Sequence, residues 1–204
     1  MESFAEQYAE RFDWRRGRQI HNLEELSHIM GAGDDPLNPP SFAGLLALPF
    51  DNEIDKALAN SIVFLSAEAM QAFVQGYFQA CVLTCGAVLE RVLKLEYRRI
   101  HGSLPGGHWT LGRCIHQLDW RDTAITTNHL NLISEFLGPR NSRAHALLEH
   151  DNPEEANMGG QNRGVEILSE QHYTIEPFRG DAWQGMLALY PILADIYGDP
   201  ALST

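Results

Sequence analysis

The spacing of apolar residues along the chain predicts helices, and two long ones are expected to form the core. Apolar residues recur every three or four positions over residues 51–102, and Gly76 divides this stretch in two. We expect Asp51 to cap the first helix and Gly102 to end the second. The residues expected to face the core are Ile54, Leu58, Ile62 and Leu65 in the first helix, and Val82, Cys85, Leu89, Val92 and Leu93 in the second.

Three further helices are predicted in the second half of the chain. Residues 110–120 predict a short amphipathic helix, and residues 127–137 predict another that ends near Gly138. Pro139 removes a backbone hydrogen bond and clashes with the preceding turn. We therefore expect a kink or restart there, with Arg140 in a new first turn and the helix continuing to about residue 150. Residues 181–197 predict a closing helix in spite of Pro191.

The segments around these helices suggest how the chain is divided. Residues 1–30 predict a helical arm, followed by the loop GAGDDPLNPP over residues 31–40. We accordingly assign residues 1–40 to the arm and its loop, and residues 41–204 to an all-α domain. Residues 151–180 are polar and contain glycine, so we expect an irregular excursion there, with a short strand.

Composition narrows the classes of function. The chain has 204 residues, 44% of them hydrophobic, which is enough for a core. Its net charge of −12 argues against broad nucleic-acid binding and leaves room for a local basic site. We find no run of about 18 apolar residues and no apolar signal-peptide core, so no membrane helix is expected. Three cysteines suit a reducing compartment, so we expect a cytoplasmic protein.

Candidate chemistry gathers in the segment RNSRAH, residues 140–145. Asn141 and His145, four residues apart, share one face of a helix, whereas Arg140 and His145 are about 140° apart around the axis. A histidine can transfer a proton at neutral pH, an arginine can stabilise charge on a phosphoryl group, and an asparagine can orient either. Together they suit attack of an RNA 2′-hydroxyl on its own phosphodiester, without metal or cofactor. The alternative is a solvated helix end with ordinary polar residues.

Two segments of the chain resemble the HEPN superfamily. Residues 76–81 and 86–94, GYFQAC and GAVLERVLK, are similar to its second long helix, and RNSRAH is similar to its R-N-x-x-x-H motif. The resemblance covers about residues 52–150 and implies a HEPN-like up-and-down helical bundle that forms homodimers through the motif-bearing helix. Many HEPN proteins are metal-independent endoribonucleases of toxin–antitoxin and phage-defence systems. By position, Arg140 and His145 would be catalytic and Asn141 would support them.

The resemblance leaves some roles and two functions open. Glu90 matches a glutamate that can face the HEPN site, or it pairs with Lys94 four residues later. Lys94 and Arg98, with Arg143, line a phosphate track near Arg140 or form a solvated face. The chain is expected to be an endoribonuclease acting on RNA, or else a non-catalytic HEPN module that binds a protein partner or nucleotide, such as an antitoxin or a defence complex. No metal site is expected, because no cluster has metal-ligand spacing.

Overall fold

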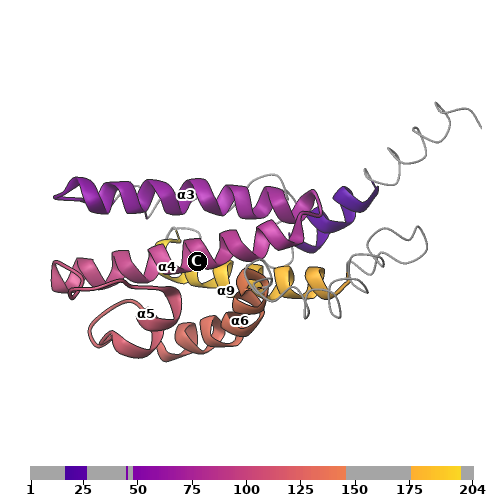
Figure 1. Ribbon diagram of the computed structural model, residues 1–204. Helices are drawn as coiled ribbons and strands as arrows, with labels where there is room; N and C mark the ends of the chain where they lie inside the picture. The colour runs from indigo at the N-terminus through magenta and orange to yellow at the C-terminus, as the bar shows by residue number, and fades with distance from the viewer. Residues whose placement is uncertain (1–16, 27–44, 46–47, 146–175, 199–204) are drawn as a thin grey trace, which may run out of the picture.

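The computed structural model describes residues 17–26, 45, 48–145 and 176–198 of the chain, without the side chains of residues 142–145 and 176–177. These ranges form helices joined by turns and include no strand, so the predicted all-α class is confirmed. The labelled helices of Figure 1 are α3 (Glu53–Val74), α4 (Phe78–His101), α5 (Leu111–Gln117), α6 (Thr127–His145) and α9 (Glu176–Tyr197).

The turn at Gly76 makes α3 and α4 a helical hairpin, as the sequence predicts. Gly76 has a φ of +80°, which glycine adopts without steric cost. Its N–H donates to the Phe73 carbonyl at 3.0 Å, and the Tyr77 N–H donates to the Ala72 carbonyl at 2.8 Å. This pair of bonds is a Schellman motif, which satisfies the last carbonyls of α3 and turns the chain back. The two helices therefore lie side by side (Figure 1).

The buried face of α3 differs from the predicted one. Ile54, expected in the core, is 60% exposed, and Leu58 and Leu65 are only partly buried. The helix begins after Asn52, whose side chain accepts from the Asp55 N–H, so the cap lies one residue beyond the predicted Asp51. The residues that face the interior are Asp55, Ala59, Ile62, Ser66, Ala69 and Phe73. Apolar residues occur on every side of α3 itself, so hydrophobicity alone does not decide which side faces the core. Polar contacts such as the ion pair of Asp55 with Arg98 help to decide it.

Helix α4 is the centre of the bundle. Its predicted apolar stripe is buried in full, and Gly102, with a φ of +76°, ends the helix as expected. It contacts α3, α5, α6 and α9. In Figure 1, α3 lies on one side of α4, and α5 and α6 lie on the other.

Two helices contain a proline and continue through it. Of the predicted kink or restart at Pro139, the restart does not occur, because α6 is one helix from Thr127 to His145. Arg140 therefore lies well inside a helix and not in a first turn. Helix α9 runs through Pro191 and begins at Glu176, so residues 176–180 are helical and not part of an irregular excursion. The strand expected within residues 151–175 falls outside the described ranges.

Residues 17–26 of the predicted arm form a helix that packs on the bundle. Leu26 is 1% exposed, and the buried Asn22 amide donates to the Phe73 carbonyl at 3.1 Å. Glu25 forms an ion pair with Arg179 of α9, and the Arg18 guanidinium lies 5.4 Å from the centre of the Phe78 ring. The boundary predicted near residue 40 therefore does not separate this helix from the domain.

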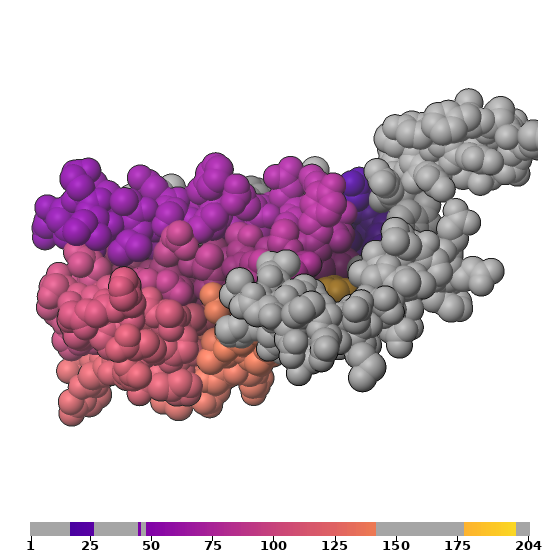
Figure 2. Space-filling model, viewed as in Figure 1, coloured from indigo at the N-terminus to yellow at the C-terminus, as the bar shows by residue number. Residues whose placement is uncertain are grey.

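Helix α3 is apolar over much of its length. Within the described ranges, α3 is the one helix that is long and apolar enough, by length and composition, to cross a membrane. A core helix of a soluble protein passes the same test, so the expectation of no membrane helix stays a prediction. Only 28% of the apolar window is buried. Figure 2 shows α3 in violet along the outer edge of the molecule.

Candidate functional site

The candidate site is built on the inward face of α6. His129, Ile133 and Phe136 of this helix are buried, and Arg140 follows Phe136 at the next position of the same stripe. Arg140 is itself half-buried. The arginine of the RNSRAH segment thus points toward the bundle. In the alternative of a solvated helix end, its side chain would be expected to point into solvent.

A glycine of α4 makes room for this arginine. A Cβ atom placed on Gly86 would lie 2.9 Å from Cγ and 3.1 Å from Nε of Arg140. Real Cβ atoms do not approach that closely, so the side chain can lie against α4 only because residue 86 is glycine. Gly86 opens the segment GAVLERVLK. The two segments that carry the HEPN resemblance are therefore in direct contact in the fold.

The guanidinium of Arg140 has few partners. Its Nη1 donates to the Asn141 side-chain oxygen at 3.0 Å, so the structure brings these two motif residues together. Its Nε is buried and has no hydrogen-bond partner among the residues that the structure describes. No described carboxylate forms an ion pair with it. A buried donor without a partner costs free energy, and a bound anion would satisfy it.

Two of the other basic residues predicted at the site are neutralised. Lys94 Nζ lies 2.6 Å from Glu90 Oε1, so the alternative in which Glu90 pairs with Lys94 is confirmed. The other oxygen of Glu90 accepts from the Leu111 N–H at 3.0 Å and so caps the N-terminus of α5. Arg98 Nε lies 2.5 Å from Asp55 Oδ1 in an ion pair between α4 and α3. Lys94 and Arg98 do not form a free phosphate track.

Arg143 and His145 are placed by their backbone only. Both lie in α6, on the turn after Arg140, and their side chains are outside the described part of the chain. Within that part, no three His, Cys, Asp or Glu side chains come together to hold a metal ion. The role of His145 as a general base and its independence from metal stay predictions.

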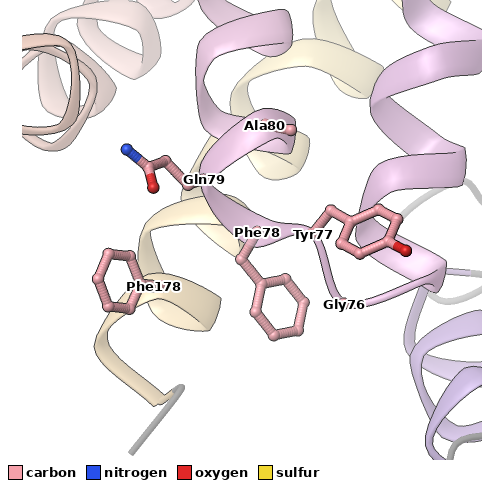
Figure 3. A pocket seen from close by; sticks show the side chains of 6 residues that line it. All are labelled: Gly76, Tyr77, Phe78, Gln79, Ala80 and Phe178. Carbon is pink, nitrogen blue, oxygen red and sulfur yellow. The ribbon is translucent and has the colours of Figure 1, made fainter. Parts of the chain in front are cut away.

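A hollow of about 310 Å³ lies at the start of α4 (Figure 3). Gln79 is on the same face of α4 as Gly86, seven residues earlier, which is two helical turns or about 10 Å. Tyr77, 64% exposed, and Phe178 of α9 add aromatic surface. The sequence offers one sign of this hollow, the adjacent aromatic pair at residues 77 and 78. The contribution of Phe178, a hundred residues away, has no local sign.

A second histidine has a complete set of partners. Nδ1 of the buried His129 accepts from the Thr126 N–H at 3.3 Å, and its Nε2 lies 3.1 Å from Asp195 Oδ2 of α9. Since Nδ1 accepts, the hydrogen of the neutral ring is on Nε2 and is donated to the carboxylate. The His129 N–H in turn donates to the Thr126 hydroxyl, which completes a capping box. His129 therefore secures the start of α6, a role that no sequence motif indicated.

The cysteines do not supply a nucleophile. Cys81, Cys85 and Cys114, the three in the chain, are all buried. A hydrogen bond with Cys81 and burial raise the pKa of the Cys85 thiol well above 9.0. Burial raises the pKa of Cys114 to about 11. Thiols in this state stay protonated at neutral pH, and the thiolate is the reactive form.

Comparison with known proteins adds no relative. No protein-family model, curated protein or solved structure gives a significant match to this chain. The HEPN resemblance therefore stays a prediction that rests on residues 76–94 and 140–145.

Proposed function

We propose that this chain is a metal-independent endoribonuclease of the toxin–antitoxin or phage-defence type, and that the R-N-x-x-x-H segment carries its reaction. The observation that carries the proposal is the state of Arg140. It lies in a seat that Gly86 leaves open, with a buried Nε that has no partner. Lys94 and Arg98 are each paired with a carboxylate, whereas Arg140 has none among the described residues. An arginine kept in this way suits a phosphate group.

In the proposed reaction, His145 removes the proton of an RNA 2′-hydroxyl, and that oxygen attacks the adjacent phosphorus. The bond from phosphorus to the 5′ oxygen breaks, and that oxygen takes up a proton, which leaves a 2′,3′-cyclic phosphate and a 5′-hydroxyl. Arg140 stabilises the charge that develops on the non-bridging oxygens, and Asn141 holds one of its amino groups. A second histidine, from a second copy of the chain bound through α6, would supply the acid.

The hollow at the start of α4 suits the base next to the cleaved bond. Aromatic side chains stack on bases of single-stranded RNA with little sequence preference. Tyr77 and Phe178 offer such surfaces, and Gln79 offers an amide between this hollow and Arg140. We expect single-stranded RNA to be the substrate class.

The second candidate function is a non-catalytic HEPN module that binds a protein partner or nucleotide. It is favoured by the net charge of −12 and by the pairing of Lys94 and Arg98, which leave few cations for an RNA backbone. This alternative keeps Arg140 as an anion site but assigns no proton transfer to His145.

The experiment that tests the proposal is cleavage of single-stranded RNA in excess chelator by wild type, His145→Ala and the matched control Ser142→Ala. Loss of a general acid or base costs about 10² to 10⁴ in rate. We expect His145→Ala to lose cleavage by that factor and Ser142→Ala to keep it, with equal melting temperatures. Equal cleavage by His145→Ala would remove the motif from the mechanism. Absence of cleavage by wild type, with loss of a bound partner or nucleotide in the variant, would favour the binding module.

A further inference from the structure

Three sulfur atoms meet in the core where α9 packs against α4. Cys81 and Cys85 are one turn apart on α4, and their Sγ atoms are 3.9 Å apart. Cys85 Sγ also lies 3.6 Å from Met186 Sδ of α9. All three side chains are 0% exposed. The sequence indicates only the cysteine pair, because Met186 is 101 positions from Cys85.

A glycine of α9 makes this arrangement possible. A Cβ atom on Gly185 would lie 3.2 Å from Cys85 Cβ, so the two helices approach this closely because residue 185 has no side chain. Met186 is the next residue of α9, and its sulfur meets Cys85 at this point of approach. A methionine side chain has three rotatable bonds, so small rotations can bring Sδ toward both cysteines.

The spacing of the sulfur atoms suits ligands of one metal ion. Zinc binds thiolate sulfur at about 2.3 Å, and Cu(I) is of similar size. Two sulfur ligands at that distance and 120° apart around the ion are about 4.0 Å from each other. The observed separations of 3.9 and 3.6 Å are slightly shorter. An ion could therefore bind between these atoms with little movement of the helices.

The identity of the donors adds to the distances, because packing alone can also bring sulfur atoms this close. Two of the three cysteines and one of the five methionines of the chain gather at this point. Within the described part of the chain, no group of three His, Cys, Asp or Glu side chains includes the pair, so oxygen and nitrogen donors do not complete it. The cluster thus offers sulfur ligands alone.

We propose that Cys81, Cys85 and Met186 form a binding site for Cu(I). Thiolate and thioether sulfur are the soft ligands that Cu(I) prefers, whereas magnesium and calcium take oxygen ligands. Zinc in a structural site has four ligands in a tetrahedron, and this cluster supplies three. On binding, two Cu–S bonds replace the S–H bonds of the cysteines, whose protons leave to solvent, and Met186 donates a lone pair. Copper stays in the +1 state throughout.

The ion can reach the buried site when α9 separates locally from α4. Gly180, Gly185 and Pro191 all lie within α9, and glycine and proline weaken a helix interior. Local opening of a weak helix exposes the groups that it covers. A bound ion would then hold α9 to α4 and stabilise the folded chain. This inference does not depend on the endoribonuclease proposal, because Arg140 and the RNSRAH segment contribute no ligand.

The first experiment measures Cu(I) binding by the full, reduced chain under anaerobic conditions. Each protein is refolded from urea with Cu(I) present, so that burial does not block entry, and competes with the Cu(I) chelator bathocuproine disulfonate. We expect wild type to retain one equivalent and to melt at a higher temperature with copper than without. Cys85→Ala should lose the equivalent. Cys114→Ala is the matched control and should keep it, because Cys114 is also buried but lies outside the cluster.

The second variant, Met186→Leu, tests the third ligand with little risk to the fold, since leucine has a similar volume and is apolar. Loss of a group that merely supports a ligand costs about 10- to 100-fold in metal affinity. We expect Met186→Leu to weaken Cu(I) binding by at least that factor. X-ray absorption should show three sulfur neighbours at about 2.3 Å in wild type and two in this variant.

Three results would overturn the proposal. The first is a wild-type chain that retains no copper after refolding. The second is binding that Cys85→Ala and Met186→Leu leave unchanged, or that Cys114→Ala loses equally, because the ion would then lie elsewhere. The third is equally tight binding of Zn(II), which would contradict the choice of Cu(I). Circular dichroism of each copper-free variant checks that a loss of binding does not come from a loss of fold.

Discussion

Arg98 of α4 and Arg140 of α6 are both partly buried between helices, and their surroundings differ in one respect. Arg98 is 13% exposed and meets the Asp55 carboxylate at 2.5 Å. Asp55 also accepts a hydrogen bond from the Asn52 amide at 2.6 Å, so the first turn of α3 supplies a second partner for this carboxylate. Within the described part of the chain, Arg140 donates to the Asn141 amide oxygen alone, and its Nε has no partner.

The difference shows how a structural cation can be told from a functional one. A buried cation with a carboxylate partner joins two helices and has no free charge for a ligand. A buried cation without such a partner costs stability, and a site that binds an anion gives a reason to keep it. The sequence alone, through residue type and motif spacing, does not show which of the two arginines has a carboxylate partner.

The largest expected effect separates them by stability. Arg98→Ala leaves the Asp55 carboxylate buried without its cation, so we expect the free energy of unfolding to fall by about 3–5 kcal/mol. Urea denaturation followed by circular dichroism measures this loss. Asp55→Asn with Arg98 intact should also destabilise. A loss below about 1 kcal/mol for Arg98→Ala would place this pair with ordinary surface ion pairs.

The next variant displaces Arg140 without removing it. Gly86→Ala places a Cβ atom 2.9 Å from Arg140 Cγ, and the long side chain must shift to another position. We expect RNA cleavage to fall by about 10²-fold, because misplacement of a catalytic group by about 1 Å has that cost. Gly180→Ala in α9 is the matched control, since no atom lies within 4 Å of its added methyl. Full cleavage by Gly86→Ala would show that the position of the Arg140 side chain against Gly86 is not needed for RNA cleavage.

Much of this fold can be predicted from the sequence, and the exceptions arise from contacts between residues far apart in the chain. The stripe of α4 is predicted correctly because its apolar residues lie on one face and polar residues on the other. For α3 the prediction is confirmed at Ile62 and wrong at Ile54. Apolar residues occur all round this helix, and Asp55, which a hydrophobic pattern assigns to the surface, lies inward in an ion pair with Arg98 of the next helix. Pro139 is tolerated in α6, where Phe136 and Arg140 on either side pack against the bundle.

The candidate site divides in the same way. The motif and the glycine that accommodates its arginine both stand in segments that the sequence singles out. The pairing of Arg98 and the contact of His129 with Asp195 connect residues 43 and 66 positions apart. No local sequence pattern indicates these long-range contacts. The sequence therefore predicted a basic track for phosphate that includes Lys94 and Arg98, whereas in the fold both are paired with carboxylates.

A third variant tests the helix crossing beside Arg140 without altering its charge. A Cβ atom on Gly185 of α9 would lie 2.9 Å from a Phe136 ring carbon and 3.2 Å from Cys85 Cβ, both in the core. Because these neighbours cannot move freely, we expect Gly185→Ala to lower the free energy of unfolding by about 1–3 kcal/mol. Thermal melts give the effect. An unchanged or raised melting temperature would mean that α4, α6 and α9 approach less closely there.

Alkaline pH tests which buried groups other than the arginines contribute to stability. Arginine stays charged throughout this range. Burial raises the pKa of Cys114 from 9.0 to about 11, so the unfolded chain loses this proton first as the pH rises. The contribution is fully present below pH 9 and should decline by about 2 kcal/mol up to pH 11. Urea midpoints between pH 8 and 11 should fall less steeply for Cys114→Ala. Identical slopes would exclude the thiol as the cause.

The most direct test of the account is the single variant Arg140→Ala, measured for both stability and RNA cleavage. Removing an unpaired, partly buried cation should leave the urea midpoint unchanged or raise it, in contrast to Arg98→Ala. Cleavage should fall by about 10² to 10³, the usual cost of losing one group that stabilises transition-state charge. A variant that is strongly destabilised, or that cleaves RNA as well as wild type, would contradict the assignment of Arg140 as the functional cation.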